Sequence, residues 1–226
     1  VERGALDLIG AARPSIADPY LPNKIKEQKT DQIKECIGCN ICVSSDNFTV
    51  PIRCTQNPTM GEEWRRGWHP ERVPSKTEEA TVLIVGAGPA GLEATRVLGQ
   101  RGYHVILAES RTELGGRVTD ESNLPGLQEW GRVRDYRVQQ IQVMPNVDVY
   151  LNSEMNAAEA MSVDAQHIAV ATGARWRRDG FGRYHHRPCE AFHPDAAILT
   201  PDDIFAGRLP SGRVLLFDDD FYYLGG

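Results

Sequence analysis

A strongly apolar run, Val82–Val85, leads directly into the glycine-rich sequence Gly86-Ala87-Gly88-Pro89-Ala90-Gly91. The run is typical of a strand that is buried on both faces, and residues 89–101 show helical spacing that stops at Gly102. Val105–Ala108 predicts a second strand, which ends at Glu109. A strand, a helix and a second strand within about 28 residues form a parallel βαβ unit. We therefore expect an α/β fold with a Rossmann-like domain.

The position of the turn between a strand and a helix gives its glycines a meaning that the pattern alone lacks. Gly86 permits the tight turn, Gly88 lets backbone N–H groups approach a pyrophosphate, and Gly91 lets the helix pack closely on the strand. The helix N-terminus, at Pro89 and Ala90, stabilises phosphate charge. The turn therefore predicts a dinucleotide site, and a tight turn without a ligand is the alternative.

Further nucleotide contacts are expected after the second strand. The carboxylate of Glu109 can accept hydrogen bonds from ribose hydroxyls and would repel a 2′-phosphate. A glycine pair lets the backbone pass close to a nucleotide, although an ordinary turn also explains it. The candidate contacts are Ser110, Arg111, Gly115, Gly116, Arg117, Thr172 and Gly173.

Four of the five cysteines are clustered, at Cys36, Cys39, Cys42 and Cys54. A tight loop with three thiolates and a distant turn with the fourth can approach a 4Fe–4S cluster from different directions. Gly38 lies inside the loop, where it permits close backbone approach. Zinc sites usually take two separated C-x-x-C pairs, which fits this spacing poorly. The cluster is the prediction, with zinc and unligated thiols as alternatives. The isolated Cys189 is expected to be a partly buried thiol.

Charge and composition exclude some classes of function. The chain has 25 basic and 31 acidic residues, so its net charge is −6. This acidic excess argues against nucleic acid or an anionic membrane as the main partner. No apolar run approaches the ~20 residues of a membrane-spanning helix, and the first residues do not form a signal peptide. Clustered cysteines are typical of a reducing compartment, so we expect a cytoplasmic protein.

Outside these motifs the chain gives coarser expectations. Leu6–Ile9 resembles a short strand, and the prolines at positions 14, 19 and 22 disfavour regular helix. Residues 61–70 look like a loop, and residues 71–80 like a polar linker. The other predicted elements are a helix around 127–144 and strands at 147–151, 167–171 and 213–217. Because the sequence lacks an initiator Met and stops soon after a strand, we expect truncation at both ends.

Several separate stretches together resemble one family. They are Asp7–Pro19, Glu35–Asn40, Cys54–Asn57, Gly61–Pro70, Val82–Gly91 and Ala171–Trp176. The chain resembles the trimethylamine dehydrogenase-like flavoproteins, which include dimethylamine and histamine dehydrogenases and the bacterial 2,4-dienoyl-CoA reductases. This resemblance implies an FMN-binding (β/α)8 TIM barrel, a 4Fe–4S cluster at its end, and two nucleotide-binding-type domains, of which the first holds ADP or FAD.

The resemblance also assigns parts of the chain. Residues 1–30 would be the end of the FMN barrel, residues 31–76 the cluster segment, residues 77–210 the ADP- or FAD-binding domain, and residues 211–226 the start of the second nucleotide-binding-type domain. Arg13 would face the FMN phosphate, with a surface ion pair as the alternative. Most of the barrel is missing, so no catalytic residue is assigned.

The final residues separate the branches of the family. Asp218-Asp219-Asp220 follows the predicted last strand, where a pyrophosphate would need N–H donors, so we expect no NAD(P)H there. This favours oxidation of an N-methylated or related small-molecule amine, with electrons leaving through the cluster to an electron-transfer flavoprotein. The alternatives are an NADPH-dependent dienoyl-CoA reductase and a non-catalytic electron-transfer module. A homo-oligomer is also compatible with the sequence.

Overall fold

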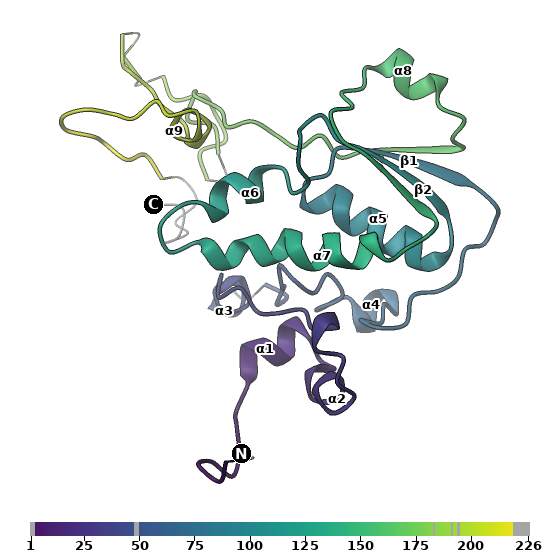
Figure 1. Ribbon diagram of the computed structural model, residues 1–226. Coiled ribbons are helices and arrows are strands. Elements are labelled where there is room, and N and C mark those ends of the chain that lie inside the picture. The colour runs from purple at the N-terminus through teal and green to yellow at the C-terminus, as the bar shows by residue number, and fades with distance from the viewer. Residues whose placement is uncertain (1–2, 48–49, 183, 191, 194, 219–226) are drawn as a thin grey trace. The chain divides into compact units, whose positions relative to one another are not determined.

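The computed structural model describes residues 3–47, 50–182, 184–190, 192–193 and 195–218 (Figure 1). Its contacts divide the chain into two units, Val1–Thr172 and Gly173–Gly226, and each is described by itself. Within the described residues, none of the helices combines the length and the apolar character needed to cross a membrane.

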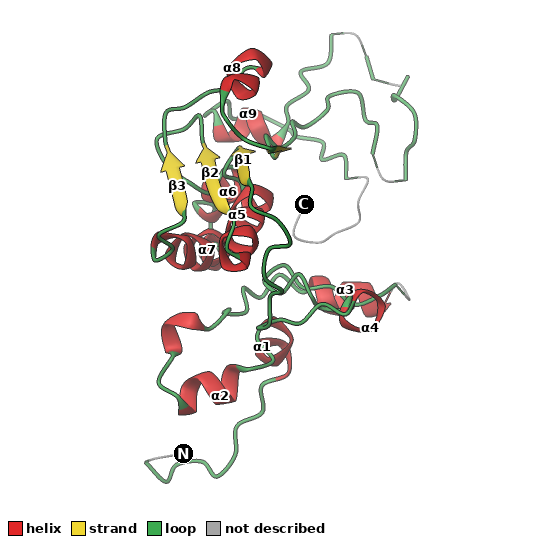
Figure 2. Cartoon of the chain, turned by 90° about the vertical axis from the view of Figure 1, so that its right-hand side faces the viewer, coloured by secondary structure: helices red, strands yellow, loops and turns green. Residues whose placement is uncertain are grey.

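The first unit contains a four-stranded parallel sheet with the strand order β3-β2-β1-β4. The strands are β1 (Thr81–Val85), β2 (His104–Ala108), β3 (Val147–Tyr150) and β4 (His167–Val170). Figure 2 shows β1, β2 and β3 side by side, running in the same direction. Val85 pairs with Ala108 on one side and with Val170 on the other, so three carboxyl ends meet at one edge. This is the edge at which open α/β sheets bind ligands.

Helices cover both faces of this sheet (Figure 1). On one face, α5 (Pro89–Arg101) and α7 (Arg132–Gln142) share a core with β1 and β2. On the other face, α8 (Ala157–Ser162) contributes Ala160 to a smaller cluster. Leu83, Ile84, Leu92 and Leu107 are fully buried, and each stabilises the fold by about 1.5–3 kcal/mol relative to exposure. The predicted Rossmann-like α/β fold is confirmed.

The predicted helices of this domain form nearly as expected. α5 begins at Pro89, where the missing N–H removes no hydrogen bond. Its C-cap is Gly102, whose left-handed φ of 92° is readily adopted by glycine. Leu92, Thr95 and Arg96 of α5 are buried. The predicted helix at 127–144 starts as a 3-10 turn, η2 (Gln128–Gly131), and continues as α7. A further short helix, α6 (Arg117–Ser122), precedes it.

The N-terminal part differs from the expectation in three places. Residues 6–9 form no strand, and Leu8 is 89% exposed. Helices α1 (Ala12–Ala17) and α2 (Leu21–Lys26) form despite their prolines, because Pro14 and Pro22 lie in the first turn, where no N–H is needed. The expected loop contains one helical turn, α4 (Glu63–Arg66), which ends at Gly67 with φ 65°. The segment also holds η1 (Thr30–Gln32) and α3 (Ile41–Asn47).

A buried ion network holds the N-terminal part together. Asp18, which has no exposed surface, pairs with Lys24 at 2.7 Å, and Lys24 also pairs with Glu71 at 2.9 Å. Lys34 reaches the same Glu71 at 3.3 Å. Burial lowers the pKa of Lys34, against the opposing effect of the Glu71 carboxylate. Although residues 71–80 form no helix or strand, the predicted linker thus begins with an anchored residue.

The second unit contains one helix within its described residues, α9 (Pro201–Phe205). Thr200 caps it through a reciprocal bond pair with Asp203. The strand predicted at 213–217 does not form, and Leu215 is 93% exposed. A buried-strand sequence needs partner strands, and the described residues of this unit supply none. Of the three aspartates expected to block NAD(P)H, Asp219 and Asp220 lie outside the described residues. Cys189 is half-buried, as predicted.

Candidate functional site

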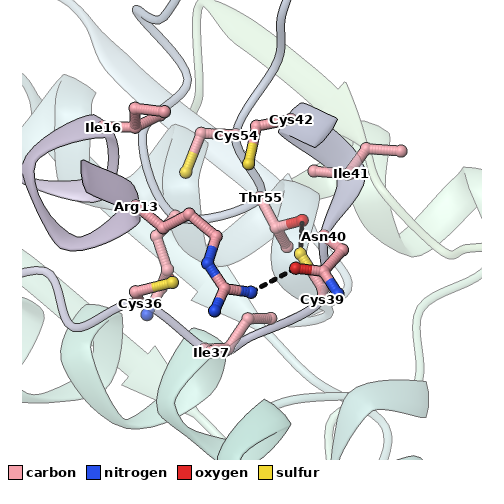
Figure 3. A pocket seen from close by; sticks show the side chains of 11 residues that line it. Arg13, Ile16, Cys36, Ile37, Cys39, Asn40, Ile41, Cys42, Cys54 and Thr55 are labelled. Carbon is pink, nitrogen blue, oxygen red and sulfur yellow. Dashed lines mark hydrogen bonds between the residues drawn. The ribbon is translucent and has the colours of Figure 1, made fainter. Parts of the chain in front are cut away.

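The four clustered cysteines line one pocket. Cys36 and Cys39 lie in an extended loop, Cys42 lies in the first turn of α3, and Cys54 lies on a second, distant loop. Gly38 and Asn40, on either side of Cys39, have left-handed φ values of 71° and 56°. The two left-handed residues reverse the backbone around Cys39. Figure 3 shows the side chains around the pocket, with Cys42 and Cys54 on one side and Cys36 and Cys39 on the other.

Neighbouring groups contact the sulfur atoms of Cys39 and Cys54. The Thr55 hydroxyl lies 3.3 Å from the sulfur of Cys39. Two backbone N–H groups, from Gln56 and Asn57, donate to the sulfur of Cys54. The pKa of the Cys54 thiol is raised overall, chiefly by burial and further by the neighbouring thiols, against the opposing effect of the two N–H donors. Backbone N–H donors stabilise a thiolate, the form that binds metal.

The four thiols line one pocket and come from two separate segments of the chain. Among the described residues, no group of three or more His, Cys, Asp or Glu side chains is placed to hold a single metal ion. A tetrahedral zinc would need all its sulfurs about 2.3 Å from the ion, whereas a cubane cluster is held by thiolates spread around a larger body. Four cysteine thiols are the usual donor set of such a cluster, so the residues present fit it.

Arg13 lies beside the cysteine loop. It lines the same pocket from α1, and its guanidinium donates to the side-chain oxygen of Asn40 (Figure 3). Its contact with an FMN phosphate remains a prediction.

The glycine-rich turn is built by close backbone contacts. A Cβ on Gly91 would lie 1.9 Å from the carbonyl oxygen of Gly86, and a Cβ on Gly86 would lie 2.5 Å from that of Ala171. A Cβ on Gly116 would lie 2.9 Å from the Cα of Gly88. A Cβ on Gly88 itself would meet nothing within 4 Å. Three of these positions are therefore closed by the protein, and Gly88 faces the open space in which a phosphate would lie.

The start of α5 supplies donors to that space. Gly88 is the N-cap of α5 and has no side chain that could cap the helix. The first N–H groups after it, beginning at Ala90, can therefore donate hydrogen bonds to a ligand. Pro89 has no N–H and occupies the first position of α5 without removing a donor.

Glu109 connects the second strand to the turn. Glu109 is 5% exposed. Its carboxylate accepts hydrogen bonds from the backbone N–H groups of Ala87 at 2.7 Å and Arg111 at 2.8 Å. The Ser110 hydroxyl donates to it at 3.2 Å. A buried carboxylate is costly without such donors. Glu109 is thus held at the sheet edge, next to the glycine turn, where the sequence predicts a ribose contact.

The other predicted contacts follow the same edge. Gly115 donates to the carbonyl of Ala87 at 2.9 Å, and Arg111 turns to α6, where it pairs with Asp120 at 3.0 Å. Arg117 is the first residue of α6. Thr172 ends the first unit after β4, and Gly173, with φ 79°, begins the second. The structure therefore brings the predicted residues of the first unit to one edge. Their nucleotide contacts remain predictions.

Known proteins share this arrangement. An NAD(P)-binding Rossmann-like domain family matches residues 84–152. A solved structure of histamine dehydrogenase from Rhizobium sp. 4-9 superposes on the chain with a TM-score of 0.90 and 54% identity, covering 99% of this chain and 33% of that one. Dimethylamine dehydrogenase from Hyphomicrobium sp. (strain x) is 45% identical over 99% of this chain and 31% of its own length.

The chain belongs to the trimethylamine dehydrogenase-like family. A solved 2-naphthoyl-CoA reductase is 28% identical with a TM-score of 0.74, covering 93% of this chain and 30% of that one. The chain spans about a third of the length of the relatives it matches. The similarity therefore concerns only that third of each relative.

Sequence reasoning missed a buried contact behind the cysteine pocket. Gln56, two residues after Cys54, is 1% exposed and bonds to α7, and Arg137 on α7 bonds back to it. A polar residue two positions after a predicted ligand cysteine was the available signal for Gln56. Nothing in the sequence marks Arg137, because its partner is far away along the chain.

Proposed function

We propose that the chain is the part of an iron–sulfur flavoprotein amine dehydrogenase that holds a 4Fe–4S cluster and a first nucleotide. Cys36, Cys39, Cys42 and Cys54 would ligate the cluster. The glycine turn and Glu109 would bind FAD or ADP, whereas FMN and the substrate would bind the rest of the complete protein. The observation that carries the proposal is that four thiols from two separate loops line one pocket.

A zinc site is the weaker assignment for this pocket. The three-plus-one spacing lacks the two separated C-x-x-C pairs that zinc sites usually use. Iron and zinc analysis of the purified complete protein, together with its visible absorbance, separates the two. Iron with inorganic sulfide supports the proposal, and stoichiometric zinc contradicts it.

In this function, the residues of this chain hold and tune an electron carrier. A bound 4Fe–4S cluster accepts and releases single electrons at a potential set by charge, hydrogen bonds and solvent exposure. The N–H groups of Gln56 and Asn57 would stabilise negative charge at the sulfur of Cys54. Ile37, which is 7% exposed and packs with Val118 and Val133, would keep water from one side of the loop.

The similarity to known relatives favours amine oxidation. The two amine dehydrogenases are more similar to this chain than the CoA reductase is. We propose that electrons come from a small-molecule amine and leave for an electron-transfer flavoprotein.

No disulfide joins the five cysteines, which agrees with a cytoplasmic location.

Anaerobic titration of the complete protein tests the reaction. We expect an N-methylated or related amine to bleach the flavin absorbance rapidly and NADPH to leave it unchanged. Rapid bleaching by NADPH would identify the reductase alternative. Bleaching by neither, with the cluster present, would identify a non-catalytic electron-transfer module.

Glu109→Ala is expected to weaken nucleotide retention by roughly 1–3 kcal/mol, because a charge-assisted acceptor is lost. The measurement is the FAD or ADP that co-purifies with the protein and its dissociation constant. Glu109→Gln is the matched control, since its amide oxygen can still accept one hydrogen bond. Equal retention in wild type and Glu109→Ala would refute the ribose role.

A further inference from the structure

The loop that carries Cys54 is anchored by one buried amide. The side-chain nitrogen of Gln56 donates to the carbonyl of Glu35 at 3.0 Å and to that of Arg132 at 3.3 Å. Its side-chain oxygen accepts from the guanidinium of Arg137 at 3.0 Å. Both faces of the amide are thus used, and the residue is 1% exposed. Because Glu35 directly precedes Cys36, this amide connects the first ligand loop to the fourth ligand.

The partner on α7 is itself held in place. Arg137 is 3% exposed, donates to the carbonyl of Val133 at 2.8 Å and pairs with Glu93 of α5 at 2.8 Å. Glu93 also pairs with Arg96 at 2.5 Å. One carboxylate therefore faces two guanidinium groups. The neighbouring ion network of Asp18, Lys24, Lys34 and Glu71 has two acids and two bases, so one positive charge is left over in this buried region. In Figures 1 and 2 the cysteine segment lies on the side of α7 away from the sheet.

We propose that Gln56 is a positioning residue for the 4Fe–4S cluster, and that Arg137 orients it and raises the reduction potential of the cluster. This inference rests on the proposed cluster site. The amide fixes the Cys54 loop opposite the loop of Cys36 and aligns the N–H of Gln56 with the sulfur of Cys54. The excess positive charge behind it favours the more negative, reduced cluster.

Loss of the amide should release one side of the site. In Gln56→Met, the fourth thiolate loses its anchor to α7, while Asn57 still donates to the carbonyl of Ile16 at 3.0 Å. We expect iron to be lost to a chelator about ten- to a hundredfold faster than from wild type, because removing residues that support metal ligands lowers metal affinity by about that factor. Co-purifying nucleotide should stay at the wild-type level, because Gln56 makes no contact with the glycine turn.

Substitutions of Arg137 in the complete protein test the effect of its charge. Arg137→Gln should lower the midpoint potential of the cluster, measured by an EPR-monitored redox titration. Arg137→Lys, which keeps the charge, should restore most of that potential. A structural role alone would not make the potential follow the charge at position 137.

The outcomes separate the two proposals. A wild-type protein without a 4Fe–4S signal would overturn both the proposed function and this inference. A wild-type cluster whose chelation rate is unchanged in Gln56→Met, or whose potential is unchanged in Arg137→Gln, would overturn the inference alone. Should Gln56→Met fail to fold, the comparison of Arg137→Gln with Arg137→Lys still decides the question.

Discussion

Gly91→Ala is expected to destabilise the nucleotide-binding domain by about 1–3 kcal/mol or more and to abolish nucleotide retention. A Cβ at this position would lie 1.9 Å from the carbonyl oxygen of Gly86. That atom is backbone, held between β1 and α5, so the overlap is relieved only if the helix moves away from the strand. Urea unfolding of the chain and the nucleotide content of the complete protein measure the two effects.

Gly88→Ala is the matched control. Its φ of −69° suits alanine, and its Cβ would meet nothing within 4 Å. We therefore expect wild-type stability with weakened nucleotide binding, because the new methyl group enters the space proposed for the pyrophosphate. If Gly91→Ala unfolds at the same urea concentration as wild type, the close contact is not rigid and the account of the turn is wrong.

Cys54→Ser is expected to remove most of the 4Fe–4S cluster. Iron–sulfur clusters are held by thiolates, and the serine hydroxyl is a harder ligand that is much less readily deprotonated. Because changes in residues that only support ligands already cost about 10–100-fold in metal affinity, loss of a ligand should cost at least as much. Iron and inorganic sulfide content, together with visible absorbance, provide the measurement.

Cys189→Ser controls for the loss of a thiol as such. Cys189 is half-buried and does not line the cysteine pocket. Its replacement should leave iron, sulfide and absorbance unchanged. Full cluster content in Cys54→Ser would show that the fourth ligand is another group and would remove the main support for the proposed site.

Local patterns were sufficient for the domain that carries the glycine turn. Val82–Val85 reads as buried on both faces and does lie in the sheet centre, since its neighbours on both sides are strands of the same domain. The helix after the turn begins at Pro89 and stops before Gly102 for reasons contained in those residues. The grouping of the four cysteines was predicted as well, because a three-plus-one spacing limits where a short loop can bring its thiols.

Patterns failed where a segment depends on partners. Leu6–Ile9 and residues 213–217 have strand-like sequences but form no strand, because a strand requires hydrogen-bonding neighbours, and the described residues beside them supply none. Pro14 and Pro22 disfavour a regular helix by residue type, but in the first turn of α1 and α2 they remove no hydrogen bond.

The turn, the cysteine loop and the strand–helix–strand order follow from local sequence, because each depends on residues close together along the chain. What lies behind the cysteine pocket follows from packing between distant segments. Gln56 and Arg137 are 81 residues apart, and their contact exists because α7 packs between the sheet and the cysteine segment. Side-chain hydrogen bonds over such separations follow from packing, which no local pattern encodes.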